Sequence, residues 1–317
     1  MEITESFLLE SLPNVVATTD FGFLGERYEG KVRDSYIKDD IRYLITTDRL
    51  SCFDVVVTTV PFKGQTLNQM AVEWFKLAGD IIENHLVDVP DPNVMVVKNC
   101  EILPIEVVIR GYLTGSAWRD YQDGKAISGV TLPPGLKASQ RFETPLLTPS
   151  TKAAKGDHDE PISEKEIISQ QIVPAKLWEQ VRETAFALFK LGQERAREQG
   201  LLLVDTKYEF GLYKGKLVLA DEIHTMDSSR YWISQGYEEA FAAGNAPKML
   251  DKEPTRQWLL SQGYKGEGKI PEFTDKHRIE ISQHYIKSFE LITGSKFKPE
   301  GPKVKQRIEQ NMRAYVS

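Results

Sequence analysis

The sequence predicts an α+β fold, in which a strand-rich N-terminal part precedes a mixed part of helices and strands. Two β-branched apolar runs, at 42–48 and 53–60, lie within the first hundred residues, and such runs are typical of strands. The last third reads instead as helices separated by Gly and Pro. Strands and helices that segregate in this way favour α+β over a doubly wound α/β sheet. We therefore expect two domains, at 1–105 and 106–317.

The elements of the first half follow from the spacing of apolar residues. Apolar side chains at helical intervals predict a helix at about Thr66–Ile82. Two further apolar runs, Asn93–Lys98 and Ile105–Ile109, are expected to pair with each other as strands. Residues 139–163 are rich in Pro, Thr, Lys and Asp, and this composition predicts a loop.

The second half is expected to combine one hairpin with several helices. A long helix is predicted at about Ala175–Gln199, because Gly200 suits the position just past its end. Next, the runs LLLV and KLVLA, joined by the turn-like GLYKG, predict a β-hairpin. Three more helices are expected, at about Ser229–Ala243, Lys252–Gln262 and Asp275–Thr293.

Composition narrows the class of partner. The 317 residues include 40 Lys and Arg against 46 Asp and Glu, a net charge of −6, which argues against a nucleic-acid binder because phosphate backbones require a basic surface. Cys52 and Cys100 form no metal-binding or disulfide pattern and fit a reducing cytosol. The N-terminus lacks a secretory pattern, and no apolar run approaches the roughly 18 residues of a membrane helix. We expect a cytoplasmic monomer or small homo-oligomer without nucleic-acid or membrane partners.

The segment 201–230 carries the strongest chemical signal. It holds five carboxylates, which belong to Asp205, Glu209, Asp221, Glu222 and Asp227. Across the predicted hairpin, Glu209 and Asp221 come near each other, and two such acids repel unless a cation lies between them. A Mg²⁺ ion held by one or two carboxylates and by nucleotide phosphates meets this requirement. A solvated acidic hairpin is the alternative.

A basic motif near the N-terminus predicts contact with phosphates. Residues 28–36 read YEGKVRDSY, and alternation in an extended strand points Lys31 and Arg33 to one face. Gly30 permits close approach of the backbone to a ligand. These residues are expected to form a hairpin over a nucleotide's phosphates, and an ordinary surface hairpin with alternating cations is the alternative.

A third motif, VVIRGYLTGSAWRDY at 107–121, predicts an anion site. A buried strand leads to Arg110, a Gly-rich turn and a helix that opens near Ser116. A helix N-terminus offers free N–H groups and the positive end of a dipole, and Arg110 adds a bidentate phosphate donor. A capped helix with Arg110 paired to a surface acid is the alternative.

Two loops add further polar candidates. Asp48, Arg49, Ser51 and Asp54 cluster in TTDRLSCFDV, where loops at strand ends often carry function, although a capped turn with an Asp–Arg pair explains them equally. The sequence DSSR at 227–230 follows the hairpin. Its serines are expected to cap a helix while Arg230 reaches an anion.

Taken together, six segments resemble the SAICAR synthetase (phosphoribosylaminoimidazole-succinocarboxamide synthase) family of purine biosynthesis. They follow one another in the family's order: GKVRDSY (30–36), TTDRLSCFD (46–54), VVIRGYLTGSAWRDY (107–121), TPSTKAAKGDHDEPIS (148–163), VDTKYEFG (204–211) and LADEIHTMDSSRYW (219–232). The resemblance covers most of the chain. It implies an ATP-grasp-like and kinase-like architecture, with ATP in the cleft between a smaller β-domain and a larger α+β domain.

The resemblance also implies the reaction. ATP, L-aspartate and 5-amino-1-(5-phosphoribosyl)imidazole-4-carboxylate give the succinocarboxamide, ADP and phosphate, with Mg²⁺ as the metal and an acyl phosphate as the expected intermediate. We expect the loop at 148–163 to cover the site, because acyl phosphates hydrolyse unless water is excluded. On the residues alone, a non-catalytic nucleotide-binding protein and another acyl-phosphate ligase are the competing functions.

The implied roles fall on residues that the motifs had singled out, with Lys98 added. Nucleotide binding is assigned to Gly30, Lys31, Arg33, Lys98, Glu209 and Asp221, of which Glu209 and Asp221 also hold Mg²⁺. Lys207 is expected to neutralise the reacting carboxylate or the transferred phosphoryl group, and it is grouped with Asp205 as catalytic. The 5′-phosphate pocket is assigned to Arg110, Ser116 and Arg230, and further substrate contacts to Asp48, Arg49, Ser51 and Asp54.

Overall fold

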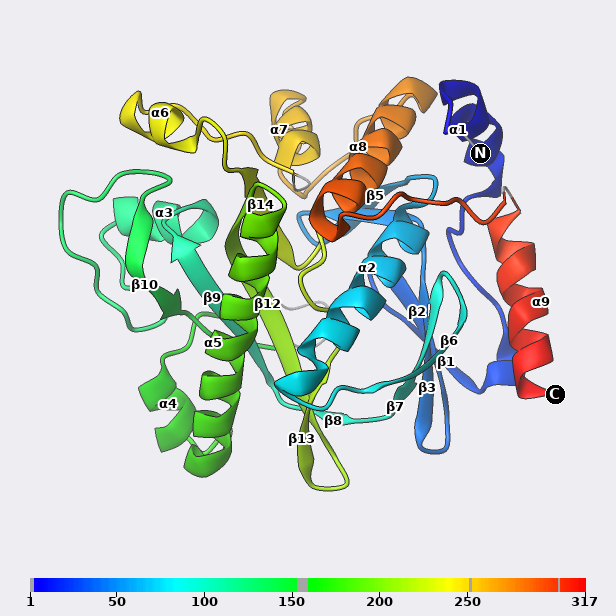
Figure 1. Ribbon diagram of the computed structural model, residues 1–317, viewed down its shortest axis with the longest axis horizontal. Helices are drawn as coiled ribbons and strands as arrows, with labels where there is room; N and C mark the ends of the chain where they lie inside the picture. The colour runs from blue at the N-terminus through cyan, green and yellow to red at the C-terminus, as the bar shows by residue number, and fades with distance from the viewer. Residues whose placement is uncertain (1–2, 153–158, 251–252, 302) are drawn as a thin grey trace. The chain divides into compact units, whose positions relative to one another are not determined.

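The computed structural model describes residues 3–152, 159–250, 253–301 and 303–317. Contacts within the chain divide it into two compact units (Figure 1). Unit 1 comprises Met1–Phe75, His85–Asn99 and Asp251–Ser317, and unit 2 comprises Lys76–Asn84 and Cys100–Leu250. The α+β class is confirmed, because antiparallel sheets and helices are both present in the described residues. None of the described helices has the length and apolar character needed to span a bilayer.

Unit 1 contains an antiparallel sheet in the order β1-β2-β3-β7-β6. Its strands are β1 (Glu26–Glu29), β2 (Arg33–Lys38), β3 (Ile41–Thr46), β6 (Leu86–Asp91) and β7 (Val94–Lys98). A separate two-stranded ribbon pairs β4 (Arg49–Cys52) with β5 (Val55–Thr59). The buried residues of β3 and β7 are mostly Val, Ile and Leu, which pack well on a pleated surface.

The helices of unit 1 come from both ends of the chain. They are α1 (Glu5–Ser11), α2 (Lys63–Leu77), α7 (Glu253–Ser261), α8 (Asp275–Thr293) and α9 (Val304–Val316). Helix α8 has the predicted bounds because Thr274 caps its first turn and Gly294, with φ of 73°, ends it. The predicted helices at 66–82 and 252–262 correspond to α2 and α7, although residue 252 lies outside the described residues.

The grouping by contacts differs from the expected boundary between residues 105 and 106. Helix α8 is hydrogen-bonded to the end of β5 and to the residues just after it. Arg278 Nε donates to the Thr59 carbonyl at 2.8 Å, and Ser282 Oγ donates to the Pro61 carbonyl at 2.7 Å. Arg307 of α9 likewise donates to Asp91. These long-range contacts place the C-terminal helices with the N-terminal sheet, a link that linear order does not reveal.

Unit 2 is organised around the long strand β12 (Leu201–Tyr213). Its sheet follows the order β10-β9-β12-β13, with β14 and β8 also pairing with β12 and β11 pairing with β9. These strands are β8 (Glu101–Ile102), β9 (Ile105–Tyr112), β10 (Arg141–Leu147), β11 (Ser150–Thr151), β13 (Lys216–Ala220) and β14 (Ser229–Ile233). The predicted hairpin of β12 and β13 is confirmed.

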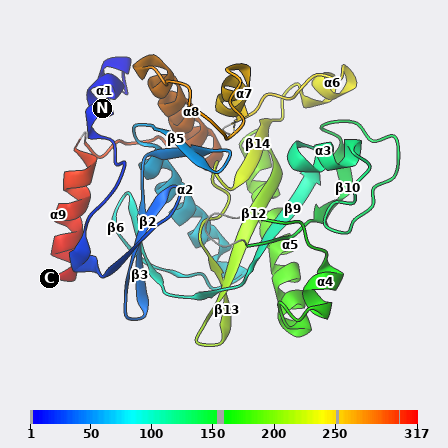
Figure 2. The ribbon, with the colours of Figure 1, turned by 180° about the vertical axis from the view of Figure 1, so that it is seen from behind.

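Helices surround this sheet. They are α3 (Gly115–Gln122), α4 (Glu164–Ser169), α5 (Ala175–Glu198) and α6 (Tyr237–Ala242). Helix α5 packs along β12, as both ribbon views show (Figures 1 and 2). Gly192 permits this approach, because a Cβ there would lie 2.6 Å from Cδ2 of Leu203 in β12. The helix predicted at 175–199 is therefore confirmed.

Three local predictions were wrong. Residues 229–233 form strand β14 rather than the start of a helix, because five residues pair with β12 and bury Tyr231 and Trp232. The predicted loop at 139–163 contains β10 and β11, and Pro145 in the edge strand β10 coincides with a register shift. The runs at 93–98 and 105–109 do not pair, because β7 joins β3 and β6 whereas β9 joins β12.

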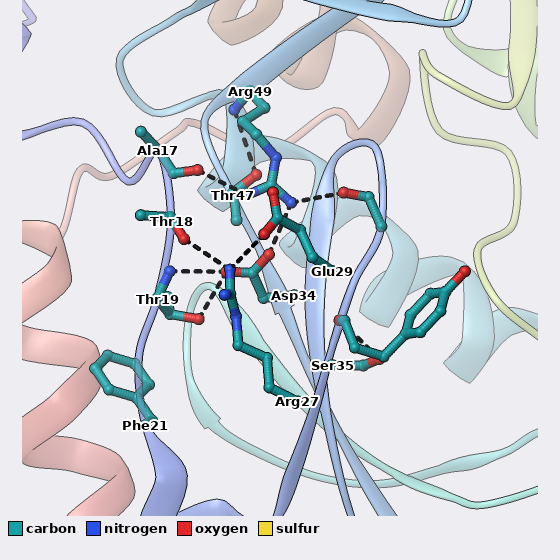
Figure 3. Close-up of polar contacts among 12 residues, drawn as sticks. Ala17, Thr18, Thr19, Phe21, Arg27, Glu29, Asp34, Ser35, Thr47 and Arg49 are labelled. Atoms are coloured by element: carbon teal, nitrogen blue, oxygen red, sulfur yellow. Dashed lines mark hydrogen bonds and ion pairs between the residues drawn. The ribbon is translucent and has the colours of Figure 1, made fainter. Parts of the chain in front are cut away.

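A buried charge network holds the N-terminal segment of unit 1 to its sheet (Figure 3). Asp34 of β2 is fully buried and accepts hydrogen bonds from the Thr19 backbone and hydroxyl and from Arg49, at 2.7–2.8 Å. Arg49 also donates to the carbonyls of Ala17, Gly30 and Lys31. Burial alone would raise the pKa of Asp34, but the hydrogen bonds from Arg49 and Thr19 outweigh it and lower that pKa.

Asp48 is buried with a different balance. Its carboxylate accepts from the backbone N–H groups of Val16 at 2.8 Å and Gly64 at 3.0 Å. Burial raises the pKa of Asp48 to about 6, although these two hydrogen bonds and the Lys63 and Arg307 charges oppose the rise. At pH values between the unfolded-state pKa and the folded-state pKa, the Asp48 carboxyl is therefore protonated in the folded chain and ionised in the unfolded chain.

We expect Asp48 to give a stability contribution that falls as pH rises. Between about pH 4 and pH 6 the folded chain binds more protons at this site, so the free energy of unfolding should decrease by about 3 kcal/mol. The measurement is urea unfolding of the parent chain and of Asp48→Asn at several pH values, taken as a difference profile. The variant Asp39→Asn, at an exposed carboxylate, is the control for the general effect of removing one charge. The assignment would be contradicted if the free energy of unfolding of the parent minus that of Asp48→Asn rose from pH 4 to pH 6.

Candidate active site

Two arginines and one aspartate meet on adjacent strands of unit 2. Strand β12 lies between β9 and β14, and its Asp205 is the ladder partner of both Arg110 and Arg230. Oδ2 of Asp205 accepts from Arg110 Nη1 at 3.2 Å and also from Arg230 Nη1. One carboxylate thus contacts the two guanidinium groups of this arginine pair and balances only one of their two positive charges. The structure brings together three residues that the sequence had singled out separately.

The arginine pair lies at the start of helix α3. Arg110 Nη2 is 3.3 Å from the Ser116 hydroxyl, and Nε donates to Thr148 Oγ1 at 2.9 Å. Gly115 has φ of +61°, and a Cβ there would lie 2.7 Å from Arg230 Nη1, so glycine permits the guanidinium to approach the helix end. Within the described residues, the Thr114 side chain makes no capping hydrogen bond. First-turn N–H groups and two guanidinium groups together favour an anion.

Burial acts strongly on Arg110. It lowers the pKa of the guanidinium, and the neighbouring Asp205 charge opposes that effect. Side-chain exposure is 12% for Arg110 and 25% for Arg230. A partly desolvated pair of this kind interacts more strongly with an incoming anion than exposed arginines would.

Further along β12, Lys207 lies in a lysine–carboxylate cluster with Lys152, Glu106 and Glu209. Lys207 Nζ donates to Glu106 Oε1 at 2.5 Å and to Glu209 Oε1 at 3.0 Å. Lys152 Nζ donates to the other oxygen of Glu209. The contact between Lys207 and Glu209 confirms that they share a face of the strand, as the period of two requires.

The cluster fixes the charge of Lys207. Burial alone would lower the pKa of its ammonium, but attraction to Glu209, Glu106 and Asp221 outweighs burial and raises it. Burial also raises the pKa of Glu106, against the opposing Lys207 charge. Lys207 is therefore a fixed cation rather than a proton donor at neutral pH.

The carboxylates of the hairpin suit Mg²⁺ in chemistry. Glu209 is the ladder partner of Ala220, and Asp221 follows directly with φ of 65°. Glu209 is 5% exposed, and ammonium groups contact both of its oxygens. In the described parts of the chain, no group of three His, Cys, Asp or Glu residues is arranged to hold a metal. A Mg²⁺ ion needs only one or two protein carboxylates where substrate phosphates supply other ligands, so this donor set fits.

In unit 1, the predicted phosphate-binding hairpin forms, but with Lys31 in its turn. Strands β1 and β2 pair as expected, yet β2 begins only at Arg33, so Lys31 and Arg33 do not alternate along one strand. Lys31 Nζ contacts Asp54 Oδ1 at 2.7 Å, and both side chains are 58% exposed. Arg33 and Lys98 are half-buried.

The remaining candidates of unit 1 are largely buried. Asp48, Arg49 and Ser51 are at most 9% exposed. Arg49 bonds the carbonyls of Gly30 and Lys31, so it supports the turn that carries Lys31. These contacts favour a structural role for Asp48 and Arg49, whereas Asp54 presents an exposed carboxylate.

Sequence reasoning did not single out Glu106, Thr148 or Lys152. A signal for Glu106 existed, because a carboxylate within the apolar run IEVVI is costly to bury without a partner. Lys152 and Thr148 come from the 148–163 segment, which was expected to cover the site as a whole. Residues 153–158 of that expected cover lie outside the described residues.

Comparison with known proteins gives a consistent result. A family model described as SAICAR synthetase matches residues 26–272. A phosphoribosylaminoimidazole-succinocarboxamide synthase of Bacteroides fragilis is 47% identical over 307 residues, which cover 94% of this chain and 98% of the relative. The Legionella pneumophila synthase is 43% identical over 316 residues, which cover 96% of this chain and 100% of that protein.

Solved structures agree with the sequence relatives. A SAICAR synthase from Saccharomyces cerevisiae complexed with SAICAR is 30% identical, with a TM-score of 0.78, and the match covers 90% of this chain and 100% of that one. A SAICAR synthetase in complex with ADP is 25% identical, with a TM-score of 0.65, and the match covers 86% of this chain and 100% of that one.

Proposed function

Because the chain belongs to the SAICAR synthetase family, we propose that the arginine pair and the lysine–carboxylate cluster are the substrate-binding and reacting parts of its active site. The chain is an ATP-dependent ligase of purine biosynthesis. It joins L-aspartate to the carboxylate of 5-amino-1-(5-phosphoribosyl)imidazole-4-carboxylate and forms SAICAR, ADP and phosphate. The observation that carries the assignment of residues is that both groups meet strand β12, the arginine pair at Asp205 and the cluster at Lys207 and Glu209.

The arginine pair is proposed to bind the 5′-phosphate of the ribonucleotide. Two guanidinium groups, the Ser116 hydroxyl and the start of α3 converge there, and a dianionic phosphate matches their charge and donors. Asp205 holds both arginines in place and is a positioning residue in this arrangement. The yeast relative was solved with SAICAR, a ligand that carries the same phosphate.

Lys207 is proposed to stabilise the reacting carboxylate and the transferred phosphoryl group. Asp205 and Lys207 are two residues apart in β12, about 7 Å along a strand, so the phosphate end and the reacting end of one substrate can lie along the same strand. The carboxylate attacks the γ-phosphorus of ATP, ADP leaves, and the aspartate amine then displaces phosphate from the acyl phosphate while losing a proton. Fixed positive charge assists because phosphoryl transfer depends on positioning and on charge neutralisation.

Glu209 and Asp221 are proposed to hold Mg²⁺, which would neutralise charge on the nucleotide phosphates. Within the described residues, Lys152 and Lys207 contact the Glu209 carboxylate, so a metal ion would share this carboxylate with the lysines or replace one of them. In unit 1, we propose that Gly30, Lys31, Arg33 and Lys98 contact the nucleotide and that Asp54 contacts substrate. We propose that the buried residues Ser51, Asp48 and Arg49 act indirectly, by holding in place the segment that carries these contacting residues.

Relatives that are named as synthases do not favour a non-catalytic nucleotide-binding protein. A ligase with a different amine or acid is distinguished by substrate profiling. The ATP-grasp-like architecture, the cytoplasmic location and the monomeric or small homo-oligomeric state remain predictions. The assay for the reaction is ADP release with ATP, Mg²⁺, L-aspartate and the ribonucleotide, and leaving out any one component should abolish turnover.

In that assay, Arg230→Ala is expected to raise KM for the ribonucleotide by about 10- to 100-fold, the scale of a lost charged hydrogen bond. The corresponding nucleoside, which lacks the phosphate, should react equally slowly with the parent enzyme and the variant. Arg119→Ala removes an exposed arginine from α3, the helix that begins beside the arginine pair, and should leave KM unchanged. If the Arg230→Ala variant lost activity equally with the nucleotide and the nucleoside, the assignment of Arg230 to the phosphate site would be wrong.

A further inference from the structure

A pocket in unit 1 shares no residue with the proposed active site. It has a volume of about 350 Å³ and is lined by Thr255, Trp258, Phe273, His277, Glu280, Ile281 and His284. These residues come from α7, from α8 and from the segment between them, and both ribbon views show the two helices side by side (Figures 1 and 2). Pockets of this size hold small molecules. We call it the α7–α8 pocket.

Three rings form an angled aromatic wall. Trp258 and Phe273 have centroids 4.7 Å apart with their planes at 56°, and Trp258 and His277 are 4.9 Å apart at 60°. Rings inclined in this way leave a corner rather than a parallel slot. A corner between inclined rings can hold an alkyl group, because apolar surface packs against ring faces and edges alike. Aromatic faces attract cations through their quadrupole.

Several polar side chains of the pocket can accept hydrogen bonds, and the Glu280 carboxylate can only accept them. His277, Glu280 and His284 recur at helical spacing, so they share one face of α8. A carboxylate accepts only, and a neutral imidazole accepts through one nitrogen. Nδ1 of His277 is covered by protein and has no hydrogen-bond partner among the described residues. A turn of the ring would be needed to bring that nitrogen to a ligand.

Glu280 is the acidic residue in the described lining of the pocket. Among its described lining residues none is Lys or Arg. The neighbouring arginines are directed elsewhere, because Arg256 lies over the Phe53 ring at 4.8 Å and Arg278 donates to Thr59. Lys276 lies 3.9 Å from Glu280 in an exposed pair, and because exposed pairs are weak, a ligand cation can compete with Lys276 for the carboxylate. A phosphate or carboxylate ligand would therefore find no cation aimed at it.

We propose that the α7–α8 pocket binds an organic ammonium ion. The ammonium donates N–H to the Glu280 carboxylate, while its alkyl part packs in the corner between Trp258 and Phe273. Aromatic walls are a known solution for binding such cations. The proposal does not depend on the ligase reaction, because no residue assigned to that reaction lines the pocket.

The experiment is a titration of the full chain followed by proton NMR of the histidine ring Cε1–H groups. The chain contains five histidines, so their resonances can be resolved, and His277→Gln and His284→Gln assign the two from the pocket. n-Butylamine, which is protonated at pH 7.5, is the probe, and 1-butanol is its neutral counterpart. We expect n-butylamine to shift the His277 and His284 resonances saturably and 1-butanol to bind at least about tenfold more weakly.

Variants of the pocket sharpen the test. Glu280→Gln should weaken n-butylamine binding by about tenfold, and Trp258→Leu should weaken it as well. Glu309→Gln changes an exposed carboxylate of α9 in the same unit and should leave binding unchanged. The proposal would be overturned if 1-butanol bound as tightly as n-butylamine, or if butyrate or adenine bound more tightly. It would also be overturned if all five histidine resonances shifted equally, or if Glu280→Gln bound n-butylamine with unchanged affinity.

Discussion

Replacement of Lys207 with methionine is expected to lower kcat by about 100- to 1,000-fold, the scale seen when one preorganised electrostatic group is lost from a reacting centre. Methionine keeps the length of the side chain but removes the charge that Glu106, Glu209 and Asp221 hold in place. The measurement is steady-state ADP release with all substrates saturating. KM for the ribonucleotide should change less than kcat, because the arginine pair remains intact.

The appropriate control is Lys216→Met, which removes an exposed lysine from β13 of the same hairpin and should retain the parent kcat. Since loss of Lys207 leaves buried carboxylates near one another, the thermal unfolding of each variant is followed in parallel. The Lys207→Arg variant provides a second test of the same role, because it keeps the positive charge but replaces the compact ammonium group with a planar guanidinium group. A kcat for Lys207→Met within threefold of the parent value would exclude the proposed role.

Replacement of Asp34 with asparagine is expected to lower the free energy of unfolding by about 3–5 kcal/mol, the usual cost of removing one partner of a buried ion pair. Arg49 would lose its carboxylate partner while remaining only 5% exposed, and the new amide group would place a donor against other donors. Urea unfolding at pH 7 measures the effect. The loss should be larger than for any exposed ion pair of unit 1.

Glu309→Gln is the matched comparison, because its partner Arg313 is 60% exposed and exposed pairs contribute about 1 kcal/mol or less. The pH dependence provides a second check. Because the folded-state pKa of Asp34 is lowered, its stabilisation is present above the unfolded pKa and is lost as pH falls through the folded one. The difference between parent and Asp34→Asn should therefore shrink in acid, and a difference below 1 kcal/mol at pH 7 would show that the network contributes little.

Elements with local signals were predicted well. Helix α8 has its predicted bounds because its N-cap, Thr274, and its terminating Gly294 directly flank it in the sequence. The β12–β13 hairpin follows from two apolar runs and the turn between them. Strand β14 was missed because its residues resemble a capped helix start and become a strand only by pairing with β12. Its assignment depends on a partner about 25 residues away.

The types of residue in the candidate site could also be predicted, but their partners could not. Arg110 and Arg230 were both expected to bind an anion, yet their shared contact with Asp205 depends on the register of three strands. Glu106 and Lys152 joined the site for the same reason. Asp48 and Arg49 belong to the same charged motif as Asp54, but Asp48 and Arg49 are buried whereas Asp54 is exposed.

The sequence by itself determined the family, the class of reaction and the chemical groups available to it, because these depend on motifs that are contiguous along the chain. Only the tertiary structure decided which of those groups meet. Asp205 and Arg110 are 95 residues apart and bond directly, whereas Arg49 is turned inward to support a backbone turn. Burial and cross-strand register are properties of the packed chain, since each depends on residues remote in sequence.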